Sequence, residues 1–184
     1  MRKAVVLGAL ALMISAPAFA QGDGYYIEGT GALELGSDVE LAGVDVATES
    51  GYRISGAIGR SFQDGLAFEL EATYGERDID GAPVTITGLG LMGNAFLEFD
   101  IQGPFGGYVG GGIGAMNVEV DLLGITDDDW VFAYQVMAGG TIQAADNVEV
   151  FAEYRYLGGA DADIGGADVG YNSHSIGVGV RFGF

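Results

Sequence analysis

Alternation of apolar and polar residues with a period of two is the feature that most constrains this 184-residue chain. Successive side chains of a β-strand point to opposite sides, so this period predicts strands with one apolar and one polar face. In the last segment, for example, Ile176 and Val178 alternate with Ser175 and Gly177. Eight segments are predicted as strands: Tyr25–Leu35, Gly51–Phe62, Leu66–Arg77, Thr87–Phe99, Gly107–Val120, Trp130–Gln143, Asn147–Leu157 and Tyr171–Phe184.

These segments are longer than the ~5–6 residues of an ordinary globular strand. They match the roughly 9–11 residues that a tilted strand needs to cross a bilayer. The segment Gly107–Val120 is so rich in Gly that its sequence leaves the phase undefined, and a shift of phase at a β-bulge is one interpretation.

The connections between the segments alternate in length. Three short ones, Gln63–Gly65, Asp100–Pro104 and Ala144–Asp146, follow the second, fourth and sixth segments, whereas those after the first, third, fifth and seventh are longer and acidic. Short turns at one end and long loops at the other are typical of an outer-membrane barrel. The sequence therefore predicts an all-β fold, an eight-stranded antiparallel transmembrane β-barrel with its acidic loops outside the cell.

The placement of charge agrees with this fold. The chain combines a formal net charge of -19 with a positive mean hydropathy. Seven glutamates of the predicted strands share the polar phase with Arg53, Arg77, Arg155 and Arg181, and this phase faces the interior of a membrane barrel. A buried charge is tolerable only when it is paired and hydrogen-bonded. We therefore predict an interior charge network of Glu28, Arg53, Glu69, Glu71, Glu98, Glu149, Glu153, Arg155 and Arg181.

The first twenty residues have the pattern of a secretory signal peptide. Arg2 and Lys3 precede an apolar run from Ala4 to Ile14, and Ala18-Phe19-Ala20 is an A-x-A cleavage site. We predict cleavage between Ala20 and Gln21, with residues 1–20 as the signal peptide and residues 21–184 as the barrel domain. The chain has no Cys, so we expect neither disulfides nor thiol chemistry after export.

Two motifs suggest chemistry that the predicted fold does not support. Gly88-Leu-Gly-Leu-Met-Gly93 matches G-x-G-x-x-G, but a dinucleotide site needs a helix after it, and a strand is predicted here. Acidic runs could attract Ca²⁺ or Mg²⁺, which prefer oxygen ligands, but their spacing is not that of an EF-hand. We expect diffuse attraction of cations by these acids: Asp127, Asp128, Asp129, Asp161, Asp163 and Asp168.

The sequence resembles the small bacterial outer-membrane β-barrels of Gram-negative bacteria, a family that includes the opacity proteins and the OmpA-like transmembrane domain. The residues that carry the resemblance are Ser175–Phe184, Phe132–Gln135, Tyr154–Tyr156, Asn94 and Glu98. The resemblance implies that Phe184 is presented to the outer-membrane assembly machinery. The chain stops at the eighth predicted strand, so we do not expect the cell-wall-binding domain of full-length OmpA-type proteins.

His174 is the single His of the chain, and Ser173 and Ser175 flank it. A lipid A deacylase among the outer-membrane barrels uses a His-x-Ser arrangement with a carboxylate. Adjacent residues of a strand face opposite sides, so His174 and its neighbouring Ser are not expected to form a catalytic pair. We expect a histidine at the membrane interface instead.

The resulting functional hypothesis is an outer-membrane protein with a structural, envelope-integrity or surface-interaction role, similar to adhesion. We expect no wide pore, because side chains fill an eight-stranded barrel, and we expect no enzymatic activity and no cofactor. Expected partners are outer-membrane lipid and lipopolysaccharide, the assembly machinery and divalent cations at the acidic loops. Nucleic acid is excluded, because phosphate binding needs clustered Lys and Arg. A narrow channel for small solutes or ions, a lipid-modifying outer-membrane enzyme and a soluble periplasmic ligand-binding barrel are the alternatives.

Overall fold

The computed structural model describes residues 24–35, 38–41, 44–47, 50–62, 65–78, 84–122, 125–164, 167–169 and 172–184. The predicted signal peptide and its cleavage site between Ala20 and Gln21 lie outside the described residues. The strands in the described part are β1 (Tyr25–Leu35), β2 (Asp38–Leu41), β3 (Val44–Ala47), β4 (Gly51–Ser61), β5 (Leu66–Asp78), β6 (Val84–Gln102), β7 (Phe105–Leu122), β8 (Ile125–Ala145), β9 (Val148–Gly159), β10 (Ala162–Ile164), β11 (Ala167–Val169) and β12 (Asn172–Gly183).

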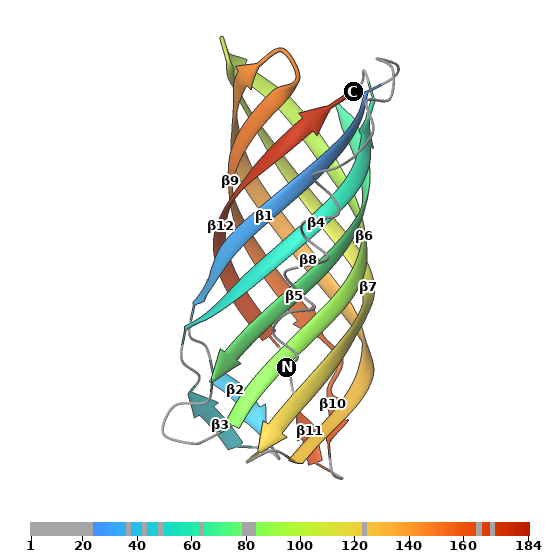
Figure 1. The fold of residues 1–184 in the computed structure, drawn as a ribbon, viewed down its shortest axis with the longest axis vertical. Coiled ribbons are helices and arrows are strands. Elements are labelled where there is room, and N and C mark those ends of the chain that lie inside the picture. The colour runs from blue at the N-terminus through green and yellow to red at the C-terminus, as the bar shows by residue number, and fades with distance from the viewer. Residues whose placement is uncertain are drawn as a thin grey trace.

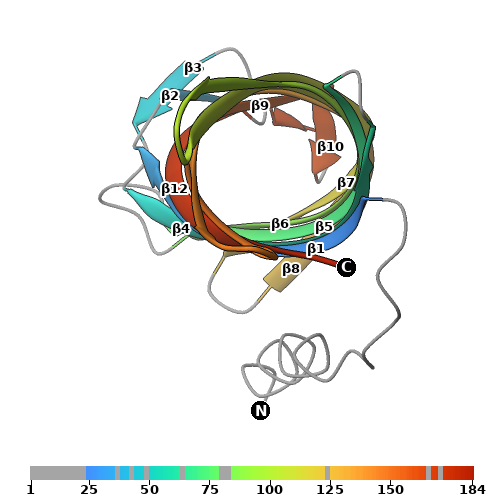
Figure 2. The ribbon, with the colours of Figure 1, turned by 90° about the horizontal axis from the view of Figure 1, so that it is seen from above.

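Eight long strands form a closed antiparallel barrel in the order β1-β12-β9-β8-β7-β6-β5-β4, and this confirms the predicted fold class. The strands are tilted against the barrel axis, and the ring is complete when the molecule is viewed from one end (Figures 1 and 2). The first and last strands close it, with pairs that run from Tyr26 opposite Gly183 to Leu35 opposite His174. No helix within the described ranges is long and apolar enough to cross a membrane.

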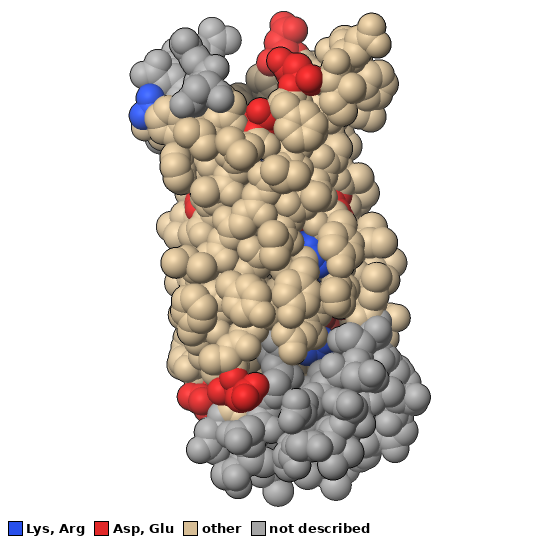
Figure 3. All heavy atoms as spheres, turned by 180° about the vertical axis from the view of Figure 1, so that it is seen from behind, with Lys and Arg blue, Asp and Glu red and all other residues tan. Residues whose placement is uncertain are grey.

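The face that the strands turn outward is apolar. Leu70 on β5 is 59% exposed, Leu91 on β6 is 56% exposed and Val178 on β12 is 65% exposed. On the face shown in Figure 3, acidic side chains gather near the two ends, and the broad band between them is mostly free of charge. Such a continuous apolar surface is stable against lipid and is rare on a monomeric soluble protein.

A small second sheet lies at the long-loop end of the barrel. The sequence did not predict this sheet. The connection after β1 contains β2 and β3, and the connection after β9 contains β10 and β11. These four strands pair in the order β10-β11-β2-β3, with Val169 of β11 opposite Leu41 of β2 (Figure 1). The two connections are therefore joined to each other by backbone pairing.

The predicted long loop after the fifth segment is wrong. β7 and β8 continue beyond their predicted ends as a hairpin, in which Leu122 pairs with Ile125 and only residues 123–124 lie between the strands. Glu119, Asp121 and Asp128 are therefore strand residues that extend the hairpin past the apolar band. The acidic residues of this stretch lie within the ladder, with Asp121 opposite Thr126 and Val120 opposite Asp127.

The Gly-rich strand β7 has one constant phase, so the β-bulge considered within it is absent. Its pairing with β8 runs without a shift from Phe105 to Leu122, and the irregularities lie near the short turns, at Asp100/Gln102 and Gln143/Ala145. A Cβ atom on Gly110 would overlap the ring of Phe96, and one on Gly112 would overlap the side chain of Asn94. Glycine on β7 thus leaves the space into which large side chains of β6 extend.

Gly114 offers a test of this packing. A Cβ atom there would overlap the carbonyl oxygen of Leu91, which is backbone and cannot rotate away, so we expect Gly114→Ala to lower the free energy of unfolding by about 1–3 kcal/mol. Urea titration of the barrel in lipid vesicles measures this loss. The matched control is Gly111→Ala, because the nearest atom to its Cβ, the carbonyl oxygen of Gln135, is 3.4 Å away. Equal losses for the two variants would contradict the explanation.

Candidate functional site: the charged interior of the barrel

The interior holds all nine residues of the predicted charge network, but it divides them into groups centred on three arginines. Proceeding from the short-turn end, where β1 begins and β12 ends, the groups are centred on Arg181, Arg155 and Arg53. The strands bring these residues inward because each lies on the phase opposite to the apolar surface.

Arg181 on β12 binds three glutamates near the short-turn end. Glu28 of β1 and Glu149 of β9 lie directly opposite Arg181 on the two neighbouring strands. Its Nε is 3.0 Å from Glu28 Oε2, and its Nη1 is 3.4 Å from Glu149 Oε1. Glu98 reaches it from β6, with 2.5 Å between Nη1 and Oε1. The guanidinium carbon also lies 4.1 Å from the centre of the Tyr26 ring, a cation–π distance.

Arg155 on β9 forms the middle group and is 3% exposed. It pairs with Glu71 of β5, which is not a neighbouring strand, so this ion pair crosses the lumen. Its Nε donates to Glu153 Oε1 at 2.8 Å, and its Nη1 donates to Gln135 Oε1 at 3.2 Å. Tyr108 donates to the other oxygen of Glu153 at 2.8 Å. The guanidinium and both carboxylates are thereby hydrogen-bonded, as a buried ionic group requires.

Glu69 links the first two groups without contacting an arginine. Asn94 donates to Glu69 at 2.9 Å and to Glu71 at 2.8 Å, and Tyr26 donates to Glu69 at 3.3 Å. Glu69 is therefore a member of the interior network whose carboxylate is bound by amide and phenol donors.

Arg53 on β4 forms the third group with a residue that the predicted network omitted. It pairs with Glu34 of β1 and donates to Ser173 Oγ of β12 at 2.6 Å. Glu34 carries the same sequence signal as the predicted members, a carboxylate on the inward phase of β1, so alternation alone could have included it. The groups also include four uncharged residues, Asn94, Gln135, Tyr26 and Tyr108. The polarity of the side chain identifies only Asn94 and Gln135 as interior residues.

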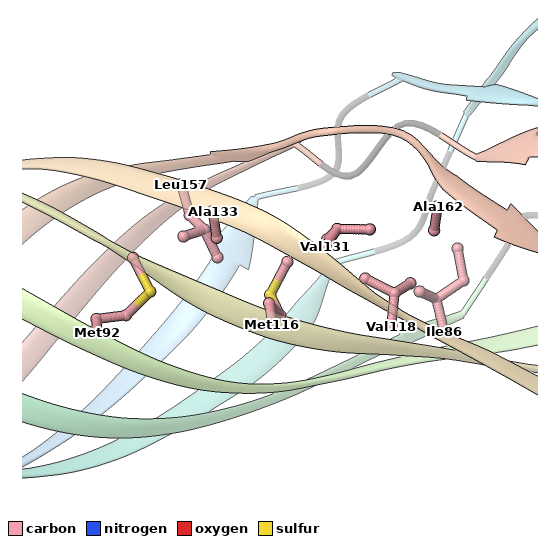
Figure 4. Packing of buried hydrophobic residues seen from close by; sticks show 8 residues of the cluster. All are labelled: Ile86, Met92, Met116, Val118, Val131, Ala133, Leu157 and Ala162. Carbon is pink, nitrogen blue, oxygen red and sulfur yellow. The ribbon is translucent and has the colours of Figure 1, made fainter.

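Two apolar clusters fill the space that the charged groups leave. One, near the short turns, consists of Ala67, Phe96, Tyr108, Met137 and Phe151. The ring centres of Phe96 and Tyr108 are 5.5 Å apart, and those of Tyr108 and Phe151 are 6.2 Å apart. The other extends toward the long-loop end (Figure 4) and consists of Ile86, Met92, Met116, Val118, Val131, Ala133, Leu157 and Ala162. The two clusters thus pack the lumen beside the charged groups, one near each end of the barrel.

His174 and its neighbouring serines lie on opposite sides of β12, and the strand geometry predicts this separation. Ser173 and Ser175 are buried inside the barrel, whereas His174 faces outward beside Tyr154 and Tyr156. The Tyr154 hydroxyl is 2.6 Å from His174 Nδ1. The arrangement is an aromatic cluster on the outer surface, and neither neighbouring serine lies on the side of β12 that carries the imidazole.

The acidic runs do not converge into a metal site, because no group of three or more His, Cys, Asp or Glu side chains in the described residues is arranged to hold a metal ion. Asp128 instead accepts a hydrogen bond of 2.7 Å from Asn117, and Asp129 accepts one of 2.8 Å from the backbone of Trp130. The side chains of Asp163 and Asp168 lie outside the described part. The main chain at Phe184 donates to the carbonyl of Tyr25 at 2.9 Å, and its role in assembly stays a prediction.

The family model described as outer membrane protein beta-barrel domain matches residues 6–182. The chain belongs to this family. The match confirms the resemblance to small outer-membrane barrels that the alternation and the terminal strand indicated.

Curated relatives and a solved structure resemble this chain over different shares of its length. An uncharacterized protein of Brucella abortus (strain 2308) is 28% identical over 130 residues, 50% of this chain and 46% of the relative. A Rickettsia prowazekii (strain Madrid E) protein whose name proposes an adhesin is 29% identical over 111 residues, 50% of this chain and 49% of the relative. The chain thus spans about half the length of the curated relatives it matches. Neisserial surface protein A superimposes with a TM-score of 0.68 at 23% identity, over 89% of this chain and 100% of that one.

Arg155 gives the strongest test of the interior. Arg155→Met leaves the carboxylates of Glu71 and Glu153 buried without their cation, so we expect a loss of about 3–5 kcal/mol in the free energy of unfolding. Urea titration in vesicles measures it. The matched control adds Glu71→Gln and Glu153→Gln to Arg155→Met, which removes both negative charges, and we expect it to recover most of the loss. A single variant as stable as the wild type would show that the pair contributes nothing.

Proposed function

We propose that this protein spans the bacterial outer membrane, with its short turns in the periplasm and its long connections outside, and acts as a non-enzymatic surface protein. The observation that carries the proposal is the combination of an apolar outer face with a lumen packed by side chains. The apolar face suits a protein that resides in lipid, and the packed lumen leaves contact at the barrel ends as the available function.

The packed interior favours a surface role over the alternative of a narrow channel. Glu71 is 1% exposed and Met116 is 2% exposed, although both point into the lumen. A water-filled path would leave such side chains accessible. Two of the arginines also connect strands on different sides of the lumen, Arg155 with Glu71 of β5 and Arg181 with Glu98 of β6, and these ion pairs obstruct passage.

The long-loop end supports a role in surface contact. The connections after β1 and β9 are joined in one small sheet, which gives this end a defined backbone shape. A preorganised surface loses less entropy on binding than separate loops do. The name of the Rickettsia relative, which proposes an adhesin, is in accord with this role.

The geometry at His174 supports the non-enzymatic part of the proposal over a lipid-modifying enzyme. The imidazole contacts tyrosine rings on the outer face, and both adjacent serines are on the opposite side of β12. Neither serine can therefore act as the nucleophile of this histidine, because a nucleophile must lie within hydrogen-bond reach of its base.

The orientation of the barrel can be tested by proteolysis of intact cells. The connection between β1 and β4 contains Glu40 and Glu49, whereas the short turns at residues 62–65, 103–104 and 146–147 contain no Glu. We expect a glutamate-specific protease to cut the protein in intact cells, and the variant Glu40→Gln/Glu49→Gln to lose the corresponding fragments. Heat-modifiable gel migration in the membrane fraction checks that both forms are folded barrels. Cutting only after the outer membrane is ruptured would reverse the orientation.

The surface role can be tested with a variant of the small sheet. Replacing residues 38–47 by a Gly/Ser linker of equal length removes β2 and β3 and keeps the barrel strands. We expect cells that carry this variant to bind immobilised host-cell surfaces several-fold less than cells with the wild type. The control is an equal amount of heat-modifiable protein in the two membrane fractions. Equal binding by both strains, and by a strain without the protein, would refute the surface role.

A further inference from the structure

The distribution of cationic side chains singles out one residue on the outer face. Residues 21–184 contain five arginines and no lysine. Arg53, Arg155 and Arg181 belong to the interior groups, and Arg77 is buried on the inward phase of β5, where it donates to the carbonyl of Asn172 at 2.9 Å. Arg60 lies on the phase of β4 that also carries the exposed Ile58. It is therefore the only Lys or Arg of this range that faces the lipid side.

Three aromatic side chains surround Arg60. Tyr25 of β1 and Phe68 of β5 lie directly opposite Arg60 on the two neighbouring strands, and Phe62 follows it two positions later. The guanidinium carbon is 5.0 Å from the centre of the Tyr25 ring and 4.9 Å from that of Phe62. Phe62 and Phe68 pack edge to face with centres 6.0 Å apart. The three rings are between 41% and 53% exposed, so this group forms part of the outer surface.

The position of this group in the barrel identifies its surroundings. β4 ends at Ser61 and β5 begins at Leu66, so Arg60 and its rings lie at the short-turn end of the apolar face. Exposed aromatic residues at the end of a membrane-spanning segment lie at the level of the lipid headgroups. A long cationic side chain there keeps its stem against apolar atoms and places its charge at the headgroups.

The chemistry of the group fits a phosphate. A guanidinium offers several N–H donors in a planar arrangement that matches phosphate oxygens, and its hydrogen bonds to an anion are charge-assisted. The contact with Tyr25, whose hydroxyl is 3.4 Å from Arg60 Nη1, and the cation–π contacts hold the guanidinium at this surface. The rings supply apolar area for the upper part of an acyl chain.

We propose that Arg60, with Tyr25, Phe62 and Phe68, forms a binding site for the phosphate of a phospholipid in the inner leaflet of the outer membrane. This inference rests on the proposed function in one respect, namely that the short turns face the periplasm. It assigns the two ends of the barrel different lipid chemistry. No arginine or lysine of residues 21–184 faces outward at the long-loop end, so a side-chain cation for direct contact with lipid phosphate is available only near the periplasm.

The experiment measures the binding of phosphatidylglycerol to the detergent-solubilised barrel by native mass spectrometry. We expect Arg60→Gln to weaken the tightest lipid adduct about fivefold to tenfold, the effect of losing a charge-assisted hydrogen bond, and Arg60→Lys to retain part of the binding. The matched control is Tyr134→Phe at the other end of the outer face, which we expect to bind like the wild type. Equal binding by wild type and Arg60→Gln would overturn the proposal.

Two further measurements separate the remaining outcomes. We expect inorganic phosphate at millimolar concentration not to displace the lipid. Displacement of the lipid by this phosphate would overturn the proposal in favour of a site for a free anion. If Arg60→Gln does not form a heat-modifiable barrel, Phe62→Ala/Phe68→Ala replaces it, and wild-type binding by that variant would also overturn the proposal. Failure of the proposed function is distinguishable, because it would show as wild-type protein that is absent from the membrane fraction or is cut only in ruptured cells.

Discussion

In a bilayer every backbone N–H and C=O group must find its partner within the protein, and this requirement determines the rest of the structure. An open sheet would leave two unpaired edges in lipid, so β1 must pair with β12. Closure after eight strands then fixes a narrow lumen, and all inward side chains share it. The residues that enter this lumen are consequently chosen both for volume and for their ability to satisfy one another.

The lumen meets this condition by alternating charged and apolar material. Arg181 and Arg155 each bind more than one glutamate, and Asn94 donates to two carboxylates from a single amide. The apolar clusters occupy the space beside these groups, where Phe96 and Met92 extend over the glycines of β7. Arginine suits this setting better than lysine, because its planar group can bind several acceptors at fixed angles.

Alternation predicted the eight barrel strands and the inward or outward direction of most side chains, because lipid and lumen impose a strict period of two. It could not define the phase of β7, since glycine occurs on both faces there and carries no polarity. It made β6, β7 and β8 too short at both ends, and at the hairpin between β7 and β8 this happened because acidic residues resemble a loop even where pairing continues. Partner choice was beyond its reach: Arg155 finds Glu71 across the lumen, and no local pattern records which strands face each other. Glu69, which binds amide and phenol donors, illustrates the same limit.

The small sheet at the long-loop end has a consequence for the order in which the chain can fold. Val169 pairs with Leu41, and the barrel closes where Leu35 pairs with His174, so both contacts join segments near opposite ends of the sequence. Contacts of such long sequence separation form slowly, because a large loop must be closed before any pairing is gained. Each of the seven other strand pairings of the barrel joins two barrel strands that follow one another in the sequence. The seam between β1 and β12 is thus expected to form last, and the pairing of β2 with β11 holds the same seam together from outside the bilayer.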